Sequence, residues 1–226
     1  MKTETLIFDD GSYGDTTAYV ARPDADTSAA VLLIHEWWGI NDHIRDLAGR
    51  FANEGYVCIA PDLFRGKLAK DSEEASQLMQ ALPIDEGLTT IWNALVTAKQ
   101  AFKLRKIGIT GFCMGGTFAL REACQTNELA AVAPFYGDIP PESALKKLKA
   151  PTLFIAGKRD AWINPQKVNE LIEVARKYNL PVEAVSYDAD HAFFNDTRPE
   201  VYQAEAAADA WRKVLALFRK HLLSQA

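Results

Sequence analysis

The chain has 226 residues, of which 48% are hydrophobic and 24% charged, and this ordinary globular composition excludes a disordered or collagen-like protein. A formal net charge of −5, with Lys and Arg dispersed among acidic residues, argues against nucleic acid as a partner. The three cysteines are an odd number and form no CxxC pair, which argues against a disulfide framework and a zinc site.

The first ten residues, MKTETLIFDD, carry acidic side chains where a secretory signal needs an apolar run. No stretch approaches the roughly 18 apolar residues of a membrane span, so we expect a cytoplasmic protein with no membrane partner. The length favours a single domain over residues 1–226, because α/β domains often reach roughly 200 to 250 residues. We expect a monomer, with a dimer as the alternative, and no bound cofactor or metal.

Apolar, β-branched segments bounded by turn residues predict about eight strands. The third to seventh are continuously apolar, as expected for parallel strands that are covered on both faces. The first two are joined by Asp10-Gly11-Ser12-Tyr13-Gly14 without a helix, which predicts an antiparallel hairpin at one edge of the sheet. The predicted strands are Thr5–Phe8, Thr16–Ala21, Ala29–His35, Tyr56–Pro61, Ile107–Gly111, Leu129–Tyr136, Pro151–Ala156 and Val182–Tyr187.

Segments with helical periodicity alternate with the later strands, which predicts a mostly parallel, doubly wound sheet with helices on both faces. One segment, residues 65–83, is polar on one face and is either a lid over a site or a solvated surface helix. The predicted helices are Ile44–Asn53, Ser72–Leu82, Glu86–Ala101, Met114–Cys124, Pro165–Lys177 and Pro199–Leu223.

The sequence from Gly111 to Gly116, GFCMGG, lies between a predicted strand and a predicted helix. This is the context of the G-x-S-x-G nucleophile elbow, with Cys113 in place of serine. Glycines are needed there because side chains next to so sharp a turn would collide where the helix passes the strand. Cys113 is therefore the candidate nucleophile, whereas Cys58 and Cys124 are expected to be small buried hydrophobes.

A catalytic cysteine needs a base, and the base needs a group that orients it. Two segments at the ends of predicted strands supply them, Gly157 to Asp160 and Asp188 to Phe193. In elbow-containing proteins the chain order is nucleophile, acid, histidine, which nominates Asp160 as the acid and His191 as the base. Asp188 and Asp190 are the alternative acids, with a surface or turn role favoured by their closeness to His191 in sequence.

The segment His35-Glu36-Trp37-Trp38-Gly39 follows the third predicted strand. It is not the metalloprotease motif H-E-x-x-H, because glycine stands where the second histidine must be. In elbow-containing proteins the loop after the corresponding strand donates one backbone N–H of an oxyanion hole, and the residue after the nucleophile donates the other. This nominates the N–H groups of Trp37 and Met114.

With these residues assembled, the chain resembles the dienelactone hydrolases, a family of the α/β-hydrolase fold marked by H-E beside the oxyanion loop and a G-x-C-x-G-G elbow. The resemblance implies hydrolysis of a small ester or enol-lactone through an acyl-enzyme intermediate. It also implies that Glu36 helps to deprotonate Cys113 when substrate arrives; the alternative is a loop carboxylate bonded to backbone. The resemblance rests on His35-Glu36, Ala60 to Phe64, Gly111 to Gly116, Phe135-Tyr136-Gly137, Gly157 with Asp160, and His191 with Phe193.

Trp38, Tyr136 and Phe193 are expected to line the substrate pocket, although aromatic residues at strand ends are as often part of the core. In the family two arginines hold a substrate carboxylate, one of them four residues after the histidine, where this chain has Asn195. Asn195 or Arg198, three residues further on, is expected to take over that contact. The other arginine comes from the region before the helix at Ser72, where the cationic residues, none a clear match, are Arg65, Lys67 and Lys70.

Three alternatives stay open at this point. A broad small-ester hydrolase would use the same residues with a different pocket. A catalytically silent protein would keep the fold as a ligand pocket, because fold does not fix function. A thiol redox sensor centred on Cys113 would need a resolving thiol, which only Cys58 or Cys124 could supply.

Overall fold

The computed structural model describes residues 1–223, in which strands and helices alternate from β3 onward except that α2 and α3 follow each other directly. The strands are β1 (Lys2–Asp9), β2 (Asp15–Arg22), β3 (Ala29–Ile34), β4 (Val57–Pro61), β5 (Lys106–Phe112), β6 (Leu129–Phe135), β7 (Thr152–Gly157) and β8 (Val182–Tyr187). The helices are α1 (Asp42–Asn53), α2 (Ser72–Ala81), α3 (Ile84–Ala101), α4 (Met114–Ala123), α5 (Glu142–Leu145), α6 (Pro165–Tyr178) and α7 (Ala204–Phe218), which a π-helical turn (Arg219–Leu223) follows.

All eight predicted strands are confirmed, with small shifts at their ends. Backbone pairing gives the strand order β1-β2-β4-β3-β5-β6-β7-β8. The hairpin β1–β2 is antiparallel and stands at one end of this order, as predicted, whereas β3 pairs with β4, β6 with β7 and β7 with β8 in parallel. The fold is therefore the predicted α/β type, a mostly parallel sheet with helices on both faces.

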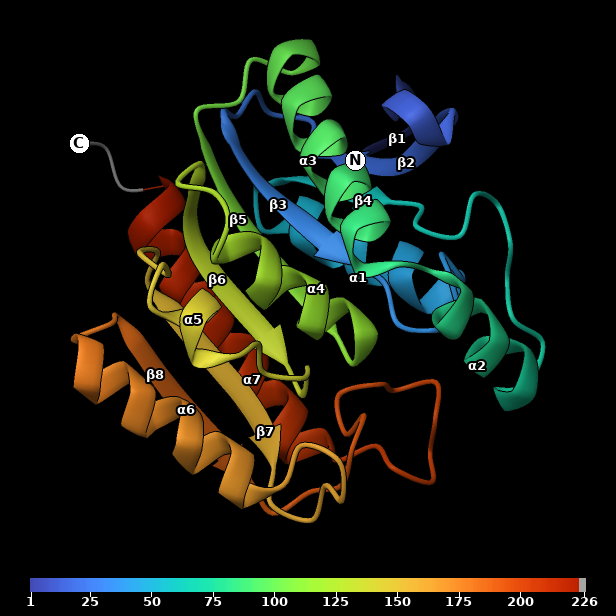
Figure 1. The fold of residues 1–226 in the computed structure, drawn as a ribbon. Coiled ribbons are helices and arrows are strands. Elements are labelled where there is room, and N and C mark those ends of the chain that lie inside the picture. The colour runs from blue at the N-terminus through green and yellow to red at the C-terminus, as the bar shows by residue number, and fades with distance from the viewer. Residues whose placement is uncertain (224–226) are drawn as a thin grey trace. The chain divides into compact units, whose positions relative to one another are not determined.

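The chain divides into two compact units, of which the first is Met1–Ile107. Its hairpin turns through a short 3-10 segment, Gly11–Tyr13, where Gly11 and Gly14 have positive φ. Every residue of β3 is buried, as its continuous apolar run requires. Helix α1 packs on β2 and β4, and α3 packs on β1 and β4; in Figure 1, α3 lies in front of these strands and α1 behind them.

The second unit begins at Gly108. Its strand β7 is fully buried between β6 and β8, whereas β8 pairs only with β7 and is half-buried along its length. Helix α4 packs on β6, α6 packs on β8, and α7 packs on β6 and β7. Figure 1 shows α4 and α6 in front of these strands and α7 behind them, so helices cover both faces. The carboxyl ends of the strands carry the loops that hold the candidate site.

Two details of the helix predictions were wrong. The last helix begins at Ala204 rather than at Pro199, because residues 195–202 form tight turns in which the N–H groups of Val201 and Tyr202 bond to the Arg198 carbonyl. Helix α5 was not predicted, since four residues are too few to carry a helical period. The prediction of one domain over residues 1–226 stays a prediction, and residues 224–226 lie outside the described part. Among residues 1–223, no helix is both long and apolar enough to span a bilayer.

Candidate active site

Cys113 occupies the turn between β5 and α4 in a strained backbone conformation. Its φ is 55° and its ψ −116°, values that a residue with a side chain rarely adopts. Its N–H donates a hydrogen bond of 3.1 Å to the carbonyl of Phe135 in β6, and its side chain is buried. The turn also leaves the N–H of Met114 among the first donors of α4, which have no partner within the helix. This geometry is that of a nucleophile elbow.

Glycines make room for α4 beside the strand that follows it. A Cβ on Gly116 would lie 2.4 Å from the Phe135 carbonyl oxygen, and one on Gly137 would lie 2.2 Å from the Gly116 carbonyl carbon. Neither site accepts any side chain without a backbone shift, because real Cβ atoms do not approach that closely. The clearance expected at Gly116 is therefore present, and Gly137 supplies the facing half of it. That Gly111 and Gly115 likewise avoid a collision between helix and strand stays a prediction.

His191 and Asp160 form a close pair between the loops that follow β8 and β7. Nδ1 of His191 lies 2.6 Å from Oδ2 of Asp160, and Asp160 is 2% exposed. The other carboxylate oxygen, Oδ1, accepts the N–H groups of Trp162 at 2.8 Å and Ile163 at 2.9 Å. Burial alone would raise the pKa of Asp160, but the hydrogen bonds from His191, Ile163 and Trp162 outweigh it and hold that pKa below its ordinary value.

This pair determines which nitrogen of His191 carries the proton. An ionised carboxylate only accepts hydrogen bonds, so Nδ1 is the donor toward Asp160 and Nε2 has its lone pair available. Nε2 is buried and has no hydrogen-bond partner among residues 1–223. The imidazole can therefore accept a proton at Nε2. The alternative acids, Asp188 and Asp190, lie in the same loop as His191, but their carboxylates pair with Arg159.

Tyr136 connects the histidine with the elbow. It follows Phe135, the residue whose carbonyl binds the Cys113 N–H, and its ring centroid is 4.9 Å from that of His191. Tyr136 is fully buried and has a φ of 39°, which turns it out of line with β6. Phe193, also fully buried, packs against it with ring centroids 5.7 Å apart. Tyr136 therefore lies beside the imidazole, and Phe193 packs against Tyr136. That either residue lines a substrate pocket stays a prediction.

One aromatic residue beside His191, Trp162, was not predicted from the sequence to belong to the site. The Trp162 ring lies 5.5 Å from the His191 ring and is 42% exposed, while its N–H binds Asp160. The sequence did contain a signal, an aromatic residue two positions after the acid in a strand-end loop. Sequence alone gives no reason to prefer it over other tryptophans. In the structure the partly exposed Trp162 ring lies next to the imidazole of His191.

The two residues expected to contact a substrate carboxylate have other bonds. Asn195 is 1% exposed, and its Oδ1 accepts the N–H and the hydroxyl of Thr197, so this oxygen holds a turn. Nε of Arg198 donates to Glu200 at 2.8 Å. The role of either residue toward substrate stays a prediction.

In the first unit, His35 braces the loop that carries Glu36. Its Nδ1 lies 2.6 Å from the Glu36 carbonyl oxygen, and its Nε2 accepts the N–H of Leu63 at 3.2 Å. Burial lowers the pKa of His35, so the ring is neutral, with Nδ1 as the donor. Glu36 is 3% exposed. The roles predicted for Glu36, Trp37 and Trp38 are not decided by these contacts and stay predictions.

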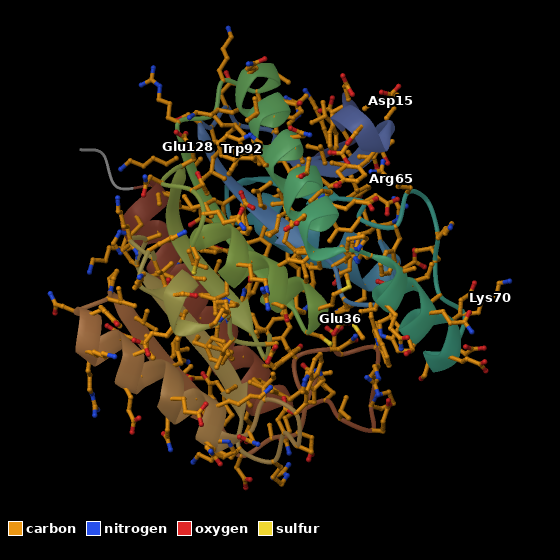
Figure 2. All side chains as sticks on the ribbon, in the orientation of Figure 1. Asp15, Glu36, Arg65, Lys70, Trp92 and Glu128 are labelled. Atoms are coloured by element: carbon orange, nitrogen blue, oxygen red, sulfur yellow. The ribbon has the colours of Figure 1, made fainter. Side chains whose placement is uncertain are left out.

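Arg65, a candidate for binding a substrate carboxylate, is bonded to other residues of the first unit. Its Nη2 lies 2.7 Å from Oδ2 of the buried Asp10, and its Nε lies 3.4 Å from Glu86. Nη1 donates to the carbonyl oxygens of Gly14 and Asp15, so the guanidinium is bonded to the end of the hairpin turn. Figure 2 labels Arg65 and Asp15. All three of its nitrogens are thus used within the first unit. These contacts give Arg65 a role in the fold, and whether it also contacts substrate stays a prediction.

The other two cysteines, Cys58 and Cys124, lie in the interior of the fold. Cys58 and Cys124 are buried, and burial raises the pKa of both thiols, that of Cys124 to about 12. They are the small buried hydrophobes that were expected. Among residues 1–223, no group of three or more His, Cys, Asp or Glu side chains is arranged to hold a metal ion.

Comparison with known proteins identifies relatives over almost the whole chain. A family model described as the dienelactone hydrolase family matches residues 16–222. A protein of Aquifex aeolicus named "Putative carboxymethylenebutenolidase" is 32% identical over 217 residues, covering 90% of this chain and 93% of that protein. A crystal structure of a "Putative Dienelactone Hydrolase" from Klebsiella pneumoniae superimposes with a TM-score of 0.85 at 29% identity, covering 97% of this chain and all of that one.

A more distant structure shares the fold alone. The dienelactone hydrolase-like promiscuous phosphotriesterase P91, from metagenomic libraries, has a TM-score of 0.89 but only 19% identity, with 98% of each chain covered. The α/β-hydrolase fold predicted from the sequence is therefore confirmed both by the strand order and by these superpositions.

Proposed function

The chain belongs to the dienelactone hydrolase family, and on this basis we propose that it hydrolyses a small ester or enol-lactone with Cys113 as nucleophile, His191 as general base and Asp160 as the acid that orients it. The observation that carries the proposal is the His191–Asp160 contact of 2.6 Å. It leaves Nε2 of His191 as the proton acceptor in the unit that also holds the strained Cys113 elbow.

In the first half of the reaction, Nε2 of His191 takes the thiol proton of Cys113, and the thiolate attacks the carbonyl carbon of the substrate. The tetrahedral intermediate collapses as the carbon–oxygen bond breaks, and the imidazolium returns the proton to the leaving oxygen. A thioester on Cys113 remains. In a lactone the leaving oxygen stays attached to the acyl group, and an enolate leaving group can itself accept the proton.

In the second half, Nε2 of His191 removes a proton from water, and the resulting hydroxide attacks the thioester. The carbon–sulfur bond breaks, the imidazolium returns its proton to the departing sulfur of Cys113, and the carboxylic acid leaves, so that the thiol and the neutral His191 are restored. Asp160 stays ionised throughout and stabilises the imidazolium that forms in each half. From the family resemblance we include Glu36 as an additional proton acceptor for Cys113, and the N–H groups of Trp37 and Met114 as donors to the oxyanion.

A broad small-ester hydrolase is the second candidate, and the arginine contacts favour it. The position that the family uses for one arginine is Asn195, whose Oδ1 holds a turn, and Arg65 is bound to Asp10 and Glu86. Arg198 is paired with Glu200. A substrate without a carboxylate therefore requires none of these pairs to change, whereas the carboxylate of a dienelactone would need a contact from Arg198, Lys67 or Lys70.

We also propose a cytoplasmic monomer that needs no cofactor and binds neither nucleic acid nor membrane, which the net charge of −5 and the free cysteines support. Size-exclusion chromatography with light scattering tests the monomer.

The acyl-enzyme is tested directly by mass spectrometry. Wild-type protein quenched during turnover of p-nitrophenyl butyrate should gain one butyryl group, which peptide mapping should locate on Cys113. Cys124→Ala, at the other end of the same helix, is the matched control and should still be acylated. An acyl group on another residue, or unchanged turnover in Cys113→Ala, would contradict the proposal. Binding of ester without any turnover in wild type would favour the silent-binding alternative.

A further inference from the structure

The loop that carries Asp160 and the loop that carries His191 are joined along their length. The N–H of Lys158 donates to the Tyr187 carbonyl at 2.8 Å, and the N–H of Arg159 donates to the Ala189 carbonyl at 3.1 Å. Gly157 allows this approach, since a Cβ there would lie 2.4 Å from the Ala189 oxygen. The two backbones are thus in contact just before the acid and just before the histidine.

The Arg159 side chain adds a second connection on the outer side of these loops. Its Nε and Nη2 bind the two carboxylate oxygens of Asp190 at 3.3 and 3.1 Å, in a bidentate arrangement. Its Nη1 binds both the carbonyl and the carboxylate of Asp188, at 3.1 and 2.5 Å. The two carboxylates raise the pKa of Arg159, and the hydrogen bond that Arg159 donates to Asp190 contributes most. The planar guanidinium therefore holds both aspartates in one geometry.

The residues joined by this connection are direct neighbours of the acid and of the histidine in the chain. Arg159 immediately precedes Asp160, and Asp190 immediately precedes His191. A shift of either loop relative to the other would change the 2.6 Å contact between Nδ1 of His191 and Oδ2 of Asp160. Asp160 is also fixed within its own loop by the N–H groups of Trp162 and Ile163, so movement of the histidine loop is what Arg159 restrains.

We propose that Arg159 is a positioning residue, which aligns His191 with Asp160 by clamping Asp188 and Asp190. The inference rests on the proposed function, because alignment matters for turnover only if His191 is the base. Arg159 is 44% exposed, so its ion pairs contribute little to global stability. Its contribution lies in the geometry of the base, where a small misplacement reduces the rate of a proton transfer strongly.

The test compares Arg159→Gln with Lys177→Gln. Lys177 is an exposed residue of the same unit whose Nζ bridges α6 to Glu142 at 2.7 Å. Both variants lose one positive charge; Arg159→Gln loses its ion pairs with Asp188 and Asp190, and Lys177→Gln loses the one with Glu142. Arg159→Gln should lower kcat by about tenfold with KM nearly unchanged, whereas Lys177→Gln should leave both unchanged. The double variant Asp188→Asn/Asp190→Asn should reproduce the loss, and adding Arg159→Gln to it should cost nothing more.

A spectroscopic measurement separates this inference from the proposed function. The proton on Nδ1 of His191 should give a far-downfield NMR resonance, identified by its loss in His191→Gln. Arg159→Gln should shift or broaden that resonance, and Lys177→Gln should not. If the resonance and kcat of Arg159→Gln match wild type, the positioning role is wrong. If the resonance responds but wild type hydrolyses no ester, the proposed function is wrong and the alignment by Arg159 still holds.

Discussion

Nδ1 of His191 lies 2.6 Å from Oδ2 of Asp160, while Oδ1 of the same carboxylate accepts two backbone N–H groups. One buried side chain thus receives three hydrogen bonds, which fixes both its orientation and its charge. The consequence is a histidine whose donor nitrogen is turned to Asp160 and whose other nitrogen is left to accept a proton.

Asp160→Asn should keep the fold and lower kcat by roughly 10² to 10⁴, because an amide can donate to Nδ1 and so stabilise the wrong tautomer of His191. Steady-state kinetics measure the loss, and circular dichroism checks the fold. Asp138→Asn is the control: Asp138 pairs with Lys167 in the same unit and should tolerate the change. Wild-type kcat in Asp160→Asn would remove Asp160 from the proposed site.

Glu122 should make stability depend on pH. This residue of α4 is 2% exposed, and burial raises its pKa from an ordinary 4.5 to about 7. A carboxyl group whose pKa is higher in the folded protein binds its proton more tightly there, so stability should fall as pH rises from 4.5 to 7. The shift corresponds to about 3 kcal/mol. Glu122→Gln should therefore raise Tm at pH 8 and change it little at pH 4.5.

Thermal unfolding at several pH values tests this effect, with the exposed Glu173→Gln as the control that should change nothing. An equal change in Tm at both pH values would mean that Glu122 acts through packing rather than through its charge.

Arg65→Gln should destabilise the protein, because it leaves the carboxylate of Asp10 buried with one cation fewer. Asp10 has no exposed surface and accepts hydrogen bonds from Arg65, Thr90 and Asn93 at 2.7, 2.5 and 2.9 Å. Breaking such a buried pair costs about 3 kcal/mol, which urea unfolding would detect. The exposed pair of Arg50 with Asp46 is the control, and Arg50→Gln should cost about 0.5 kcal/mol.

The same variant distinguishes a structural from a substrate-binding role. Arg65→Gln should leave KM for any ester unchanged once the folded fraction is accounted for. A large rise in KM with unchanged stability would show that Arg65 binds substrate instead.

Gly137→Ala should cost about 2 kcal/mol, because the added Cβ would meet the backbone of α4, 2.2 Å from the Gly116 carbonyl carbon and 2.3 Å from the Thr117 nitrogen. Relief of that clash must move the helix that begins directly after Cys113, so kcat should fall as well. Gly49→Ala is the matched control. Its Cβ would meet only the Met1 side chain, at 3.5 Å, and a helix interior favours alanine by about 0.5 to 1 kcal/mol. If both variants unfold at the same urea concentration, close packing at Gly137 is not limiting.

The strands were predictable because burial on both faces demands continuous apolar runs, as in β3 and β7. The elbow was predictable for a related reason: a nucleophile on a sharp turn needs glycines at fixed spacing, and only Cys113 has them. The start of α7 could not be predicted from the sequence. The turns at residues 195–202 depend on hydrogen bonds, which the spacing of apolar residues does not indicate.

Contacts between distant residues were the least accessible from sequence. Arg159 pairs with aspartates 29 and 31 positions away, and Arg65 with Asp10 across 55 positions. Charge patterns in the sequence indicate such pairs only within one helix. Likewise, nothing in the sequence separates Trp162, beside His191, from a tryptophan elsewhere on the surface.

The most direct test of the proposed function is kcat/KM for cis- and trans-dienelactone beside p-nitrophenyl acetate and butyrate, with wild type and Cys113→Ala. Wild type should hydrolyse at least one of these substrate classes, and Cys113→Ala should hydrolyse none, with its fold intact. A preference for dienelactone would assign the carboxylate contact to Asn195 or Arg198, and turnover of the simple esters alone would identify the broad esterase. Equal activity of wild type and Cys113→Ala would contradict the account.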